Sequence, residues 1–342
     1  MKSGRLCGER EQHMKRIVDD ARLIFKCCTL YYEDRLGQQE ICRLLGVSRP
    51  TVSRMLKLGR ERGIVKIEVI NPAAVEYGDL ERQLEKTFCL QEAIVVGNSR
   101  LEAAGDHISR AIGSAVLTYL NRILEDGQYI GVTMGRSLQN VVTSPYNGGN
   151  PIHCTFVPII GGVGENQLEM HSNYLVTKFA ELYGASCLQF FSPALFSDKT
   201  VLEGFKREQS IRSIFAVFDR LDVVLVGIGV PSSTYSTVFY MDYVAQDMLE
   251  AFSAQGAVGD ICLQYYDAVG GTAAFRPYNE RVAGMELAAL KKVPRRIGIV
   301  AGTQKAGAVL GAVRGGYVNT LITDAACAEA ILQAAANCRR EA

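Results

Sequence analysis

The sequence predicts an α/β protein with a small helical DNA-binding domain in front of a larger domain built on a parallel sheet. Residues 38–63 have the pattern of a helix-turn-helix. From Glu92 onward, short apolar stretches alternate with helical ones. These stretches are apolar along their whole length rather than at every second residue. Both faces of each strand are therefore expected to be buried, as in a parallel α/β sheet.

The length and the distribution of charge both indicate two domains. A chain of 342 residues is expected to form about two domains of ordinary size. We expect them at 13–72 and 92–336, joined by a connector helix within 73–91. Residues 1–72 hold 15 Lys and Arg against 9 Asp and Glu, a net +6, whereas the rest of the chain carries −5. A basic head on a mildly acidic body favours contact with nucleic acid at the head alone.

The composition also excludes several classes. No apolar run reaches 18 residues, and the N-terminal stretch lacks the apolar core of a signal peptide, so no membrane contact is expected. The ten cysteines are scattered and contain no CxxC pair, which favours reduced thiols in a cytoplasmic protein. We expect neither a metal site nor a cofactor.

The helix-turn-helix begins with a helix over 38–45, whose apolar residues are spaced at i, i+3 and i+4. Gly46 follows and suits the left-handed backbone that ends many helices. Ser48 is expected to cap a second helix that has Pro50 in its first turn.

The outward face of this second helix is expected to be basic and rich in hydroxyls, as a major-groove surface requires. Val52, Met55 and Leu56 would face inward. A purely structural helical hairpin is the alternative, but it leaves the excess of basic residues unexplained. The residues predicted to contact DNA are Gln39, Ser48, Arg49, Pro50, Thr51, Ser53, Arg54, Lys57 and Lys66.

The other elements follow in order along the chain. A helix is expected over 14–32, a strand or short wing over 64–70 that stops at Asn71-Pro72, and an amphipathic connector helix over 78–88. The seven sheet strands are expected at 93–97, 128–133, 154–160, 186–191, 222–229, 296–302 and 319–324.

Ligands bind parallel sheets where the C-terminal ends of strands lead into helices, and four such loops carry candidate groups. The loop 131–137 has glycines, hydroxyls and an arginine before a helix expected over 138–142, which suits a phosphate. It lacks the lysine of a nucleotide-binding P-loop, and a plain tight turn is the alternative. The predicted effector-binding residues are Gly131, Thr133, Gly135, Arg136, Ser137, Gly161, Gly162, Asp260 and Lys305.

Each candidate has an expected role and a structural alternative. The N–H groups of Gly135 and Arg136 would hold phosphate oxygens, and Lys305 would add a positive charge unless it is only solvated. Asp260 would accept a hydrogen bond from a sugar hydroxyl, or else would stabilise a turn. His171 follows the second of these loops, residues 161–165, and a lone histidine at such a place is more often structural than a ligand.

Six sequence motifs follow one another along the chain: LYYEDRLGQQEICRLLGVSRPTVSRMLKLGRERGIVKIEV, GVTMGRSL, VPIIGGVG, DVVLVGIG, AVGDICLQYYDAVG and VAGTQKAGAVLGAVRGGYVNTLITDAACAEAIL. In their order and sequence, these motifs resemble the SorC/DeoR-type sugar-binding transcriptional regulators of bacteria. The resemblance covers about residues 15–333. It implies a winged helix-turn-helix on an effector domain with the fold of sugar-phosphate isomerases and glucosamine-phosphate deaminases. It also implies operator DNA and a phosphorylated sugar or polyol as partners, and a homo-oligomer that is a dimer or tetramer.

The chain departs from the family pattern at three places. Met134 stands where tryptophan is common, and Thr303-Gln304 stands where acidic residues are common. Ile160 stands where some deoxyribose-phosphate regulators have a lysine able to form a Schiff base, so binding there is expected to be non-covalent.

Two other functions are open at this point. A sugar-phosphate isomerase or deaminase with a DNA-binding head would need positioned acid–base groups, and Asp260 and Glu165 are candidates without a supporting cluster. A recombinase would need a catalytic serine domain before the helix-turn-helix, where only about 35 residues stand.

Overall fold

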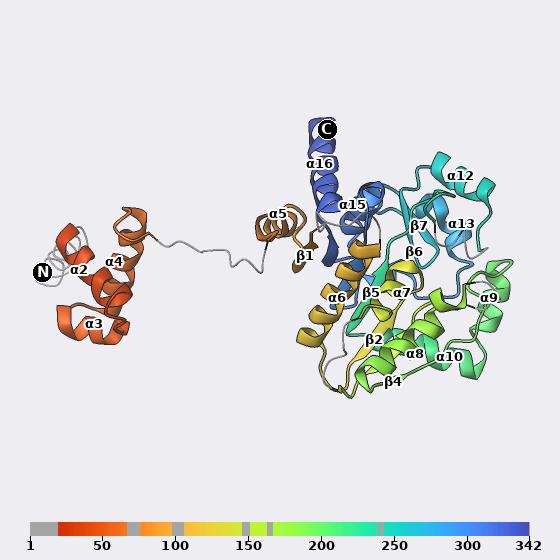
Figure 1. The fold of residues 1–342 in the computed structure, drawn as a ribbon, viewed down its shortest axis with the longest axis horizontal. Coiled ribbons are helices and arrows are strands. Elements are labelled where there is room, and N and C mark those ends of the chain that lie inside the picture. The colour runs from red at the N-terminus through yellow and green to blue at the C-terminus, as the bar shows by residue number, and fades with distance from the viewer. Residues whose placement is uncertain are drawn as a thin grey trace, which may run out of the picture. The chain divides into compact units, whose positions relative to one another are not determined.

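The computed structural model describes residues 20–66, 76–97, 106–145, 151–162, 167–236, 239 and 243–341. The chain divides into two compact units, Met1–Pro72 and Ala73–Ala342 (Figure 1). Each unit has its own core and is described by itself. Among the helices of the described residues, none has both the length and the apolar character needed to cross a membrane.

The first unit contains the predicted helix-turn-helix. Helices α2 (Ala21–Tyr32), α3 (Gln38–Leu45) and α4 (Arg49–Glu61) pack around a small core that includes Ile24, Ile41 and Met55. Gly46 ends α3 with a φ of 65°, as expected. The Ser48 hydroxyl accepts from the Thr51 N–H at 3.4 Å and caps α4, as expected.

The start of α2 differs from the prediction, and parts of two expected elements lie outside the described residues. Helix α2 begins at Ala21, because the Asp20 side chain caps it by accepting from the N–H groups of Arg22 and Leu23. The part of the expected helix at 14–19 lies outside the described residues. So does most of the expected wing at 64–70; its first residues, Ile64 and Val65, pack on the small core.

The second unit is built on one parallel sheet of seven strands in the order β1-β9-β8-β5-β2-β3-β4. All seven predicted strands are present. Their bounds are β1 Glu92–Val96, β2 Tyr129–Val132, β3 Thr155–Pro158, β4 Ser186–Cys187, β5 Val223–Gly227, β8 Arg295–Ile299 and β9 Thr320–Asp324.

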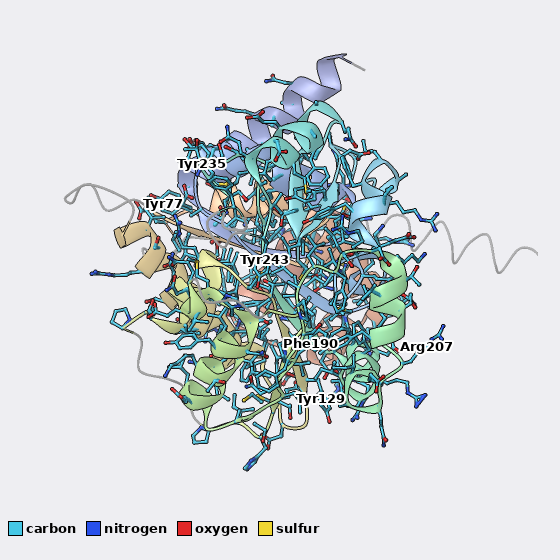
Figure 2. The ribbon with its side chains drawn as sticks, turned by 90° about the vertical axis from the view of Figure 1, so that its right-hand side faces the viewer. Tyr77, Tyr129, Phe190, Arg207, Tyr235 and Tyr243 are labelled. Carbon is cyan, nitrogen blue, oxygen red and sulfur yellow. The ribbon has the colours of Figure 1, made fainter. Side chains whose placement is uncertain are left out.

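Strand β4 is shorter than the predicted range 186–191. The Asn173 side chain accepts from the N–H of Phe190 at 2.8 Å and donates to its carbonyl at 3.1 Å. These side-chain bonds replace strand pairing at Phe190, which the side-chain view labels (Figure 2). The prediction was wrong here because an apolar stretch does not show where pairing stops.

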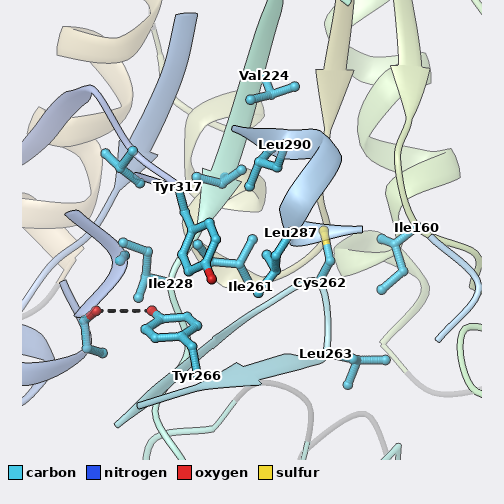
Figure 3. Packing of buried hydrophobic residues seen from close by; sticks show 14 of the residues in the cluster. Ile160, Val224, Ile228, Ile261, Cys262, Leu263, Tyr266, Leu287, Leu290 and Tyr317 are labelled. Carbon is cyan, nitrogen blue, oxygen red and sulfur yellow. Dashed lines mark hydrogen bonds between the residues drawn. The ribbon is translucent and has the colours of Figure 1, made fainter. Parts of the chain in front are cut away.

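Both faces of the sheet are buried, as the apolar strands predicted. On β5, Val223 and Leu225 contribute to one core cluster, while Val224 and Val226 contribute to the other. The first cluster lies under α6 (Asp106–Ile123), α7 (Arg136–Val142) and α8 (Ser172–Tyr183). The second includes residues of α15 (Ala306–Arg314), α16 (Ala325–Glu341) and the loops drawn in Figure 3.

The remaining elements are a short hairpin, six helices and four 3-10 turns among the described residues. A short hairpin, β6 (Gly259–Ile261) and β7 (Gln264–Tyr266), was not predicted, so Asp260 lies in a strand rather than in a loop. The helices are α5 Gly78–Phe88, α9 Lys199–Phe205, α10 Gln209–Val217, α12 Gln246–Ala254, α13 Arg276–Asn279 and α14 Leu287–Leu290, with 3-10 turns η1 Leu168–Met170, η2 Phe218–Arg220, η3 Ala273–Phe275 and η4 Thr303–Lys305.

Candidate functional site: a polar pocket at the strand ends

A pocket opens where three adjacent strands, β8, β5 and β2, end at the same edge of the sheet. The loops after β2 and β5, the turn that holds Lys305 after β8, and the hairpin β6–β7 all contribute to it. Its volume is about 40 Å³. The lining residues are Met134, Gly135, Arg136, Ser137, Gly227, Ile228, Gly229, Asp260, Cys262, Leu263 and Lys305.

Asp260 is the buried acid of this pocket. It is 4% exposed, and its Oδ1 has no hydrogen-bond partner in the part of the chain that the structure describes. Burial raises the pKa of this carboxyl to about 6, against the lowering effect of the Lys305 charge. A buried acceptor without a donor is costly, so Oδ1 is available to a ligand hydroxyl.

Gly229 makes room for that carboxylate. Its backbone pairs with Asp260, whose carbonyl accepts from the Gly229 N–H at 2.9 Å. A Cβ at position 229 would lie 2.0 Å from Asp260 Oδ1, which no side chain tolerates. The second glycine of the Gly227-Ile-Gly229 stretch is thus required by the acid opposite it.

Lys305 supplies a positive charge beside Asp260. It stands at the end of η4, directly before α15, and its Nζ donates to the Ile228 carbonyl at 2.8 Å. Burial lowers the pKa of Lys305, the charge of Asp260 raises it, and the charge of Arg136 lowers it. These mutual effects indicate that two cations and one carboxylate share this small space.

The first turn of α7 forms a further wall. Gly135 precedes it with a φ of 114° and no side-chain cap, and Arg136 and Ser137 line the pocket. The helix begins at Arg136, two residues earlier than predicted. The Gly135 N–H donates to the Met170 carbonyl at 2.8 Å, so it is not an available phosphate donor, contrary to expectation.

Two predicted residues lie beneath the pocket rather than in its lining. Gly131 is inside β2, where a Cβ would come within 2.8 Å of the Ile159 and Val224 side chains. Thr133 is 1% exposed, and its hydroxyl accepts from the Gly227 N–H at 3.1 Å. Both residues hold β2 against its neighbours and so fix where the loop after β2 begins.

The glycines after β3 also lie outside the pocket lining. A Cβ on Gly162 would meet His171 Nδ1 at 2.8 Å, and a Cβ on Gly161 would meet the backbone of Pro193 at 2.7 Å. His171 is 5% exposed, and its Nδ1 lies 3.4 Å from the hydroxyl of Tyr243, labelled in Figure 2. Close packing thus accounts for these glycines, and Glu165 lies outside the described residues.

The sequence did not single out Cys262 and Leu263, which form the turn of the hairpin. Both have left-handed backbone, with φ of 52° and 60°. Such turns usually contain Asn-Gly or Asp-Gly, so this turn has no recognisable sequence signal. Tyr266 holds the hairpin against α15 by donating to the Ala308 carbonyl at 3.0 Å (Figure 3).

A larger groove of about 500 Å³ lies between α9 and α13. Its charged side chains are largely paired with one another. Glu280 contacts Lys199 at 3.2 Å and Arg276 at 2.6 Å, and Lys206 contacts Glu203 at 3.2 Å. In the smaller pocket, by contrast, Asp260 Oδ1 is buried and has no hydrogen-bond donor among the described residues, so this pocket is the candidate ligand site.

On the DNA-binding unit, the predicted exposed face of α4 is present. Arg49, Pro50, Ser53, Arg54 and Lys57 are exposed, while the inward residues of the helix are buried. Gln39 and Lys66 are also exposed. Thr51 differs: it is 6% exposed, and its hydroxyl lies 2.8 Å from that of Ser48. It serves the helix cap and not the outward face.

Together, a helix-turn-helix with a basic outward face and a parallel α/β unit with a polar pocket define a class: transcriptional regulators that carry a ligand-binding domain. Residues 74–333 match the family model described as "Putative sugar-binding domain". The chain belongs to this family, the SorC/DeoR-type sugar-binding transcriptional regulators.

Full-length relatives share both units. The chain is 36% identical to the Sorbitol operon regulator of Klebsiella pneumoniae over 317 residues, covering 92% of this chain and 99% of the relative. It is 28% identical to the Deoxyribonucleoside regulator of Bacillus subtilis, covering 91% and 97%. The crystal structure of the full-length sorbitol operon regulator SorC superposes with a TM-score of 0.67 at 35% identity, covering 92% of this chain and 99% of that chain.

Proposed function

We propose that this regulator controls a carbohydrate-utilisation operon in the cytoplasm and that a phosphorylated sugar or polyol, bound at the strand-end pocket, sets its affinity for operator DNA. The curated relatives are named as regulators of a sorbitol operon and of deoxyribonucleosides, which supports a carbohydrate-derived effector. The pocket chemistry supports the phosphate.

The charges in the pocket suggest how such a ligand is held. Lys305 and Arg136 provide two positive charges for a phosphate, and Ser137 provides a hydroxyl. The Asp260 Oδ1 atom accepts from a hydroxyl of the carbon chain. Charge-assisted bonds are about twice as strong as neutral ones, so the phosphate is expected to provide most of the affinity.

The single observation that carries this assignment is the buried Asp260 Oδ1 atom, which has no hydrogen-bond donor among the described residues and lies in the same pocket as the half-buried Lys305. This arrangement is stable only where something repays the desolvation of both charges. A polyhydroxylated anion does so, since it offers hydroxyl donors to Asp260 and negative charge to Lys305.

The DNA-binding unit reads the operator through α4. Arg49, Ser53 and Arg54 face outward for base contacts, and Lys57 and Lys66 reach phosphates. One such helix reads a half-site, so a homodimer or homotetramer with two-fold symmetry would bind a palindromic or repeated operator.

A thermal-shift screen tests the effector class, with sugar phosphates compared against the same sugars without phosphate. We expect a sugar phosphate to raise the melting temperature while the free sugar does not. Equal stabilisation by the free sugar would contradict phosphate recognition. Mass spectrometry of the same incubations addresses the rival function, because a changed ligand would indicate a sugar-phosphate isomerase or deaminase.

A further inference from the structure

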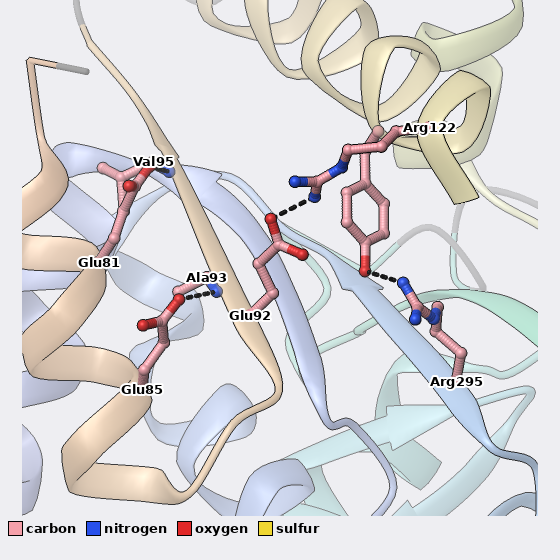
Figure 4. A network of polar contacts seen from close by, with 8 residues as sticks. Glu81, Glu85, Glu92, Ala93, Val95, Arg122 and Arg295 are labelled. Carbon is pink, nitrogen blue, oxygen red and sulfur yellow. Dashed lines mark hydrogen bonds and ion pairs between the residues drawn. The ribbon is translucent and has the colours of Figure 1, made fainter. Parts of the chain in front are cut away.

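Helix α5 lies along the outer edge of β1 and takes the place of a neighbouring strand (Figure 4). Glu85 Oε1 accepts from the Ala93 N–H at 3.0 Å, and Glu81 Oε1 accepts from the Val95 N–H at 2.9 Å. Two residues further along the chain from Val95, a Cβ on Gly97 would lie 2.5 Å from the Tyr77 hydroxyl, so Tyr77 covers that glycine.

The spacing of these three contacts explains how a helix can follow a strand. Residues 77, 81 and 85 step by four along the helix, while 97, 95 and 93 step by two along the strand. Four helical residues rise about 6.0 Å and two strand residues about 6.8 Å, so the two series stay nearly in register. The glutamates satisfy N–H groups that an edge strand otherwise leaves open.

The other side of β1 leads toward the effector pocket. Val96 is paired with Asp324 at the end of β9. Asp324 is 2% exposed; its Oδ2 accepts from the Gly302 N–H at 2.7 Å and its Oδ1 from the Cys327 N–H at 3.0 Å. The Gly302 carbonyl in turn accepts from the Lys305 N–H at 3.2 Å.

A continuous series of direct contacts therefore joins the pocket to α5. It runs from the turn of Lys305 through Gly302 to Asp324, across the β9–β1 pairing, and from Val95 to Glu81. Among the described residues, α5 is the first helix of the second unit.

We infer that this series of contacts transmits ligand binding in the effector pocket to α5. Asp324 is the positioning residue for the turn that holds Lys305. Glu81 and Glu85 make the contacts with β1 that form or break when α5 changes position. The inference rests on the proposed function, because it requires that an effector binds at Lys305. An anion that binds Lys305 Nζ would replace its hydrogen bond to the Ile228 carbonyl. This replacement alters the forces on the turn Gly302–Lys305, which Asp324 holds through the Gly302 N–H.

Such a route alters DNA binding only if the effector prefers one position of α5 over another. Within α5, Leu84 is fully buried, and Leu80 and Phe88 are partly buried against the same core. The two glutamates add direct hydrogen bonds from α5 to β1. A change at the edge of β1 therefore acts on α5 through the two glutamate contacts.

The test uses the full-length protein and the sugar phosphate that stabilises it most in the thermal-shift screen. Fluorescence anisotropy gives operator affinity with and without this ligand, and calorimetry gives ligand affinity separately. We expect the double variant Glu81→Ala/Glu85→Ala to bind the ligand within about twofold of the wild type. The ligand-induced change in its operator affinity should be at least fivefold smaller.

Arg122→Ala is the matched control. Arg122 pairs with Glu92 at the start of the same strand, and this pair is not one of the contacts in the proposed series (Figure 4). This variant should keep the wild-type change in operator affinity. An unreduced change in the double glutamate variant, or an equal reduction in Arg122→Ala, would overturn the inference.

Hydrogen exchange separates this inference from the proposed function. In Asp324→Asn, the amides of Ala93 and Val95 should exchange at least fivefold faster than in the wild type, while Arg122→Ala should leave them unchanged. Unchanged exchange in Asp324→Asn would overturn the route even if a ligand is found. If no sugar phosphate binds the wild type, the proposed function fails and takes the transmission of occupancy with it.

Discussion

At the scale of single residues, Asp260 is a carboxyl group that the fold buries away from water. Its folded-state pKa of about 6 is raised above the ordinary value of 3.8. The stability that this shift contributes is therefore fully present below about pH 4 and is lost as the pH rises through 6. Burial makes the folded protein favour the protonated form of Asp260. A ligand hydroxyl would favour the ionised form instead, because it donates a hydrogen bond to the carboxylate.

The first prediction concerns pH. Effector affinity should rise between pH 5 and 7, by about tenfold for each unit by which the ligand lowers the pKa of Asp260. The phosphate of the ligand also ionises near pH 6, so calorimetry on Asp260→Asn is the control. The difference between the two pH profiles should follow the titration of Asp260. Parallel profiles would show that Asp260 does not contact the ligand.

The second prediction concerns the outward face of α4. Arg54→Ala should weaken specific operator binding by about 1–3 kcal/mol if Arg54 contacts a guanine. Lys57→Ala should weaken all sequences alike and reduce the salt dependence. A gel-shift titration across several salt concentrations compares them, and unchanged operator affinity in Arg54→Ala would place base recognition elsewhere.

The residue scale also shows what the sequence could predict. Arg136, Ser137, Asp260 and Lys305 were predicted and do line one pocket. The glycine at 229 was seen only as part of a strand, because its requirement comes from a carboxylate that the hairpin brings opposite it. Contacts between distant segments leave no local pattern.

At the scale of elements, the helix-turn-helix was predictable because its signals are local. An apolar face, a left-handed glycine and a capping serine all act within a few residues. The hairpin β6–β7 was missed for the converse reason. Its turn of Cys262 and Leu263 takes a left-handed conformation without glycine or asparagine. Tertiary contact holds the hairpin in place, because the Tyr266 hydroxyl of β7 donates to the Ala308 carbonyl of α15.

The third prediction tests the cap of α4. Ser48→Ala should destabilise the DNA-binding unit by about 1 kcal/mol, because the Thr51 N–H and hydroxyl lose their partner. Ser48→Asp, which can still cap, should keep most of the stability. Urea denaturation, monitored by hydrogen exchange of the amides in α3 and α4, measures the free energy of unfolding of both variants. Equal stability of Ser48→Ala and the wild type would mean that the cap contributes nothing.

At the scale of the whole molecule, the order of the two units and their charge difference were readable from the sequence. The number of copies in the functional assembly is a separate matter. The unit Ala73–Ala342 contains two large core clusters of its own and is expected to fold alone.

The fourth prediction follows from this division. A fragment of residues 78–342 should still oligomerise, because α5 and the α/β unit hold most of the apolar surface of the chain. Light scattering at micromolar concentration measures its mass beside that of the full-length protein. A monomeric fragment would place the contact between copies in the DNA-binding unit.

The central claim is that a sugar phosphate in the strand-end pocket controls operator binding. Operator affinity, titrated with and without the stabilising sugar phosphate, tests it most directly in the wild type and in Ser137→Glu. We expect the ligand to change wild-type affinity by about 5–150-fold, the usual range of allosteric coupling. Ser137→Glu should bind the operator normally yet not respond, because it places a negative charge where the phosphate binds. A full response in Ser137→Glu, or an equal wild-type response to the unphosphorylated sugar, would contradict the account.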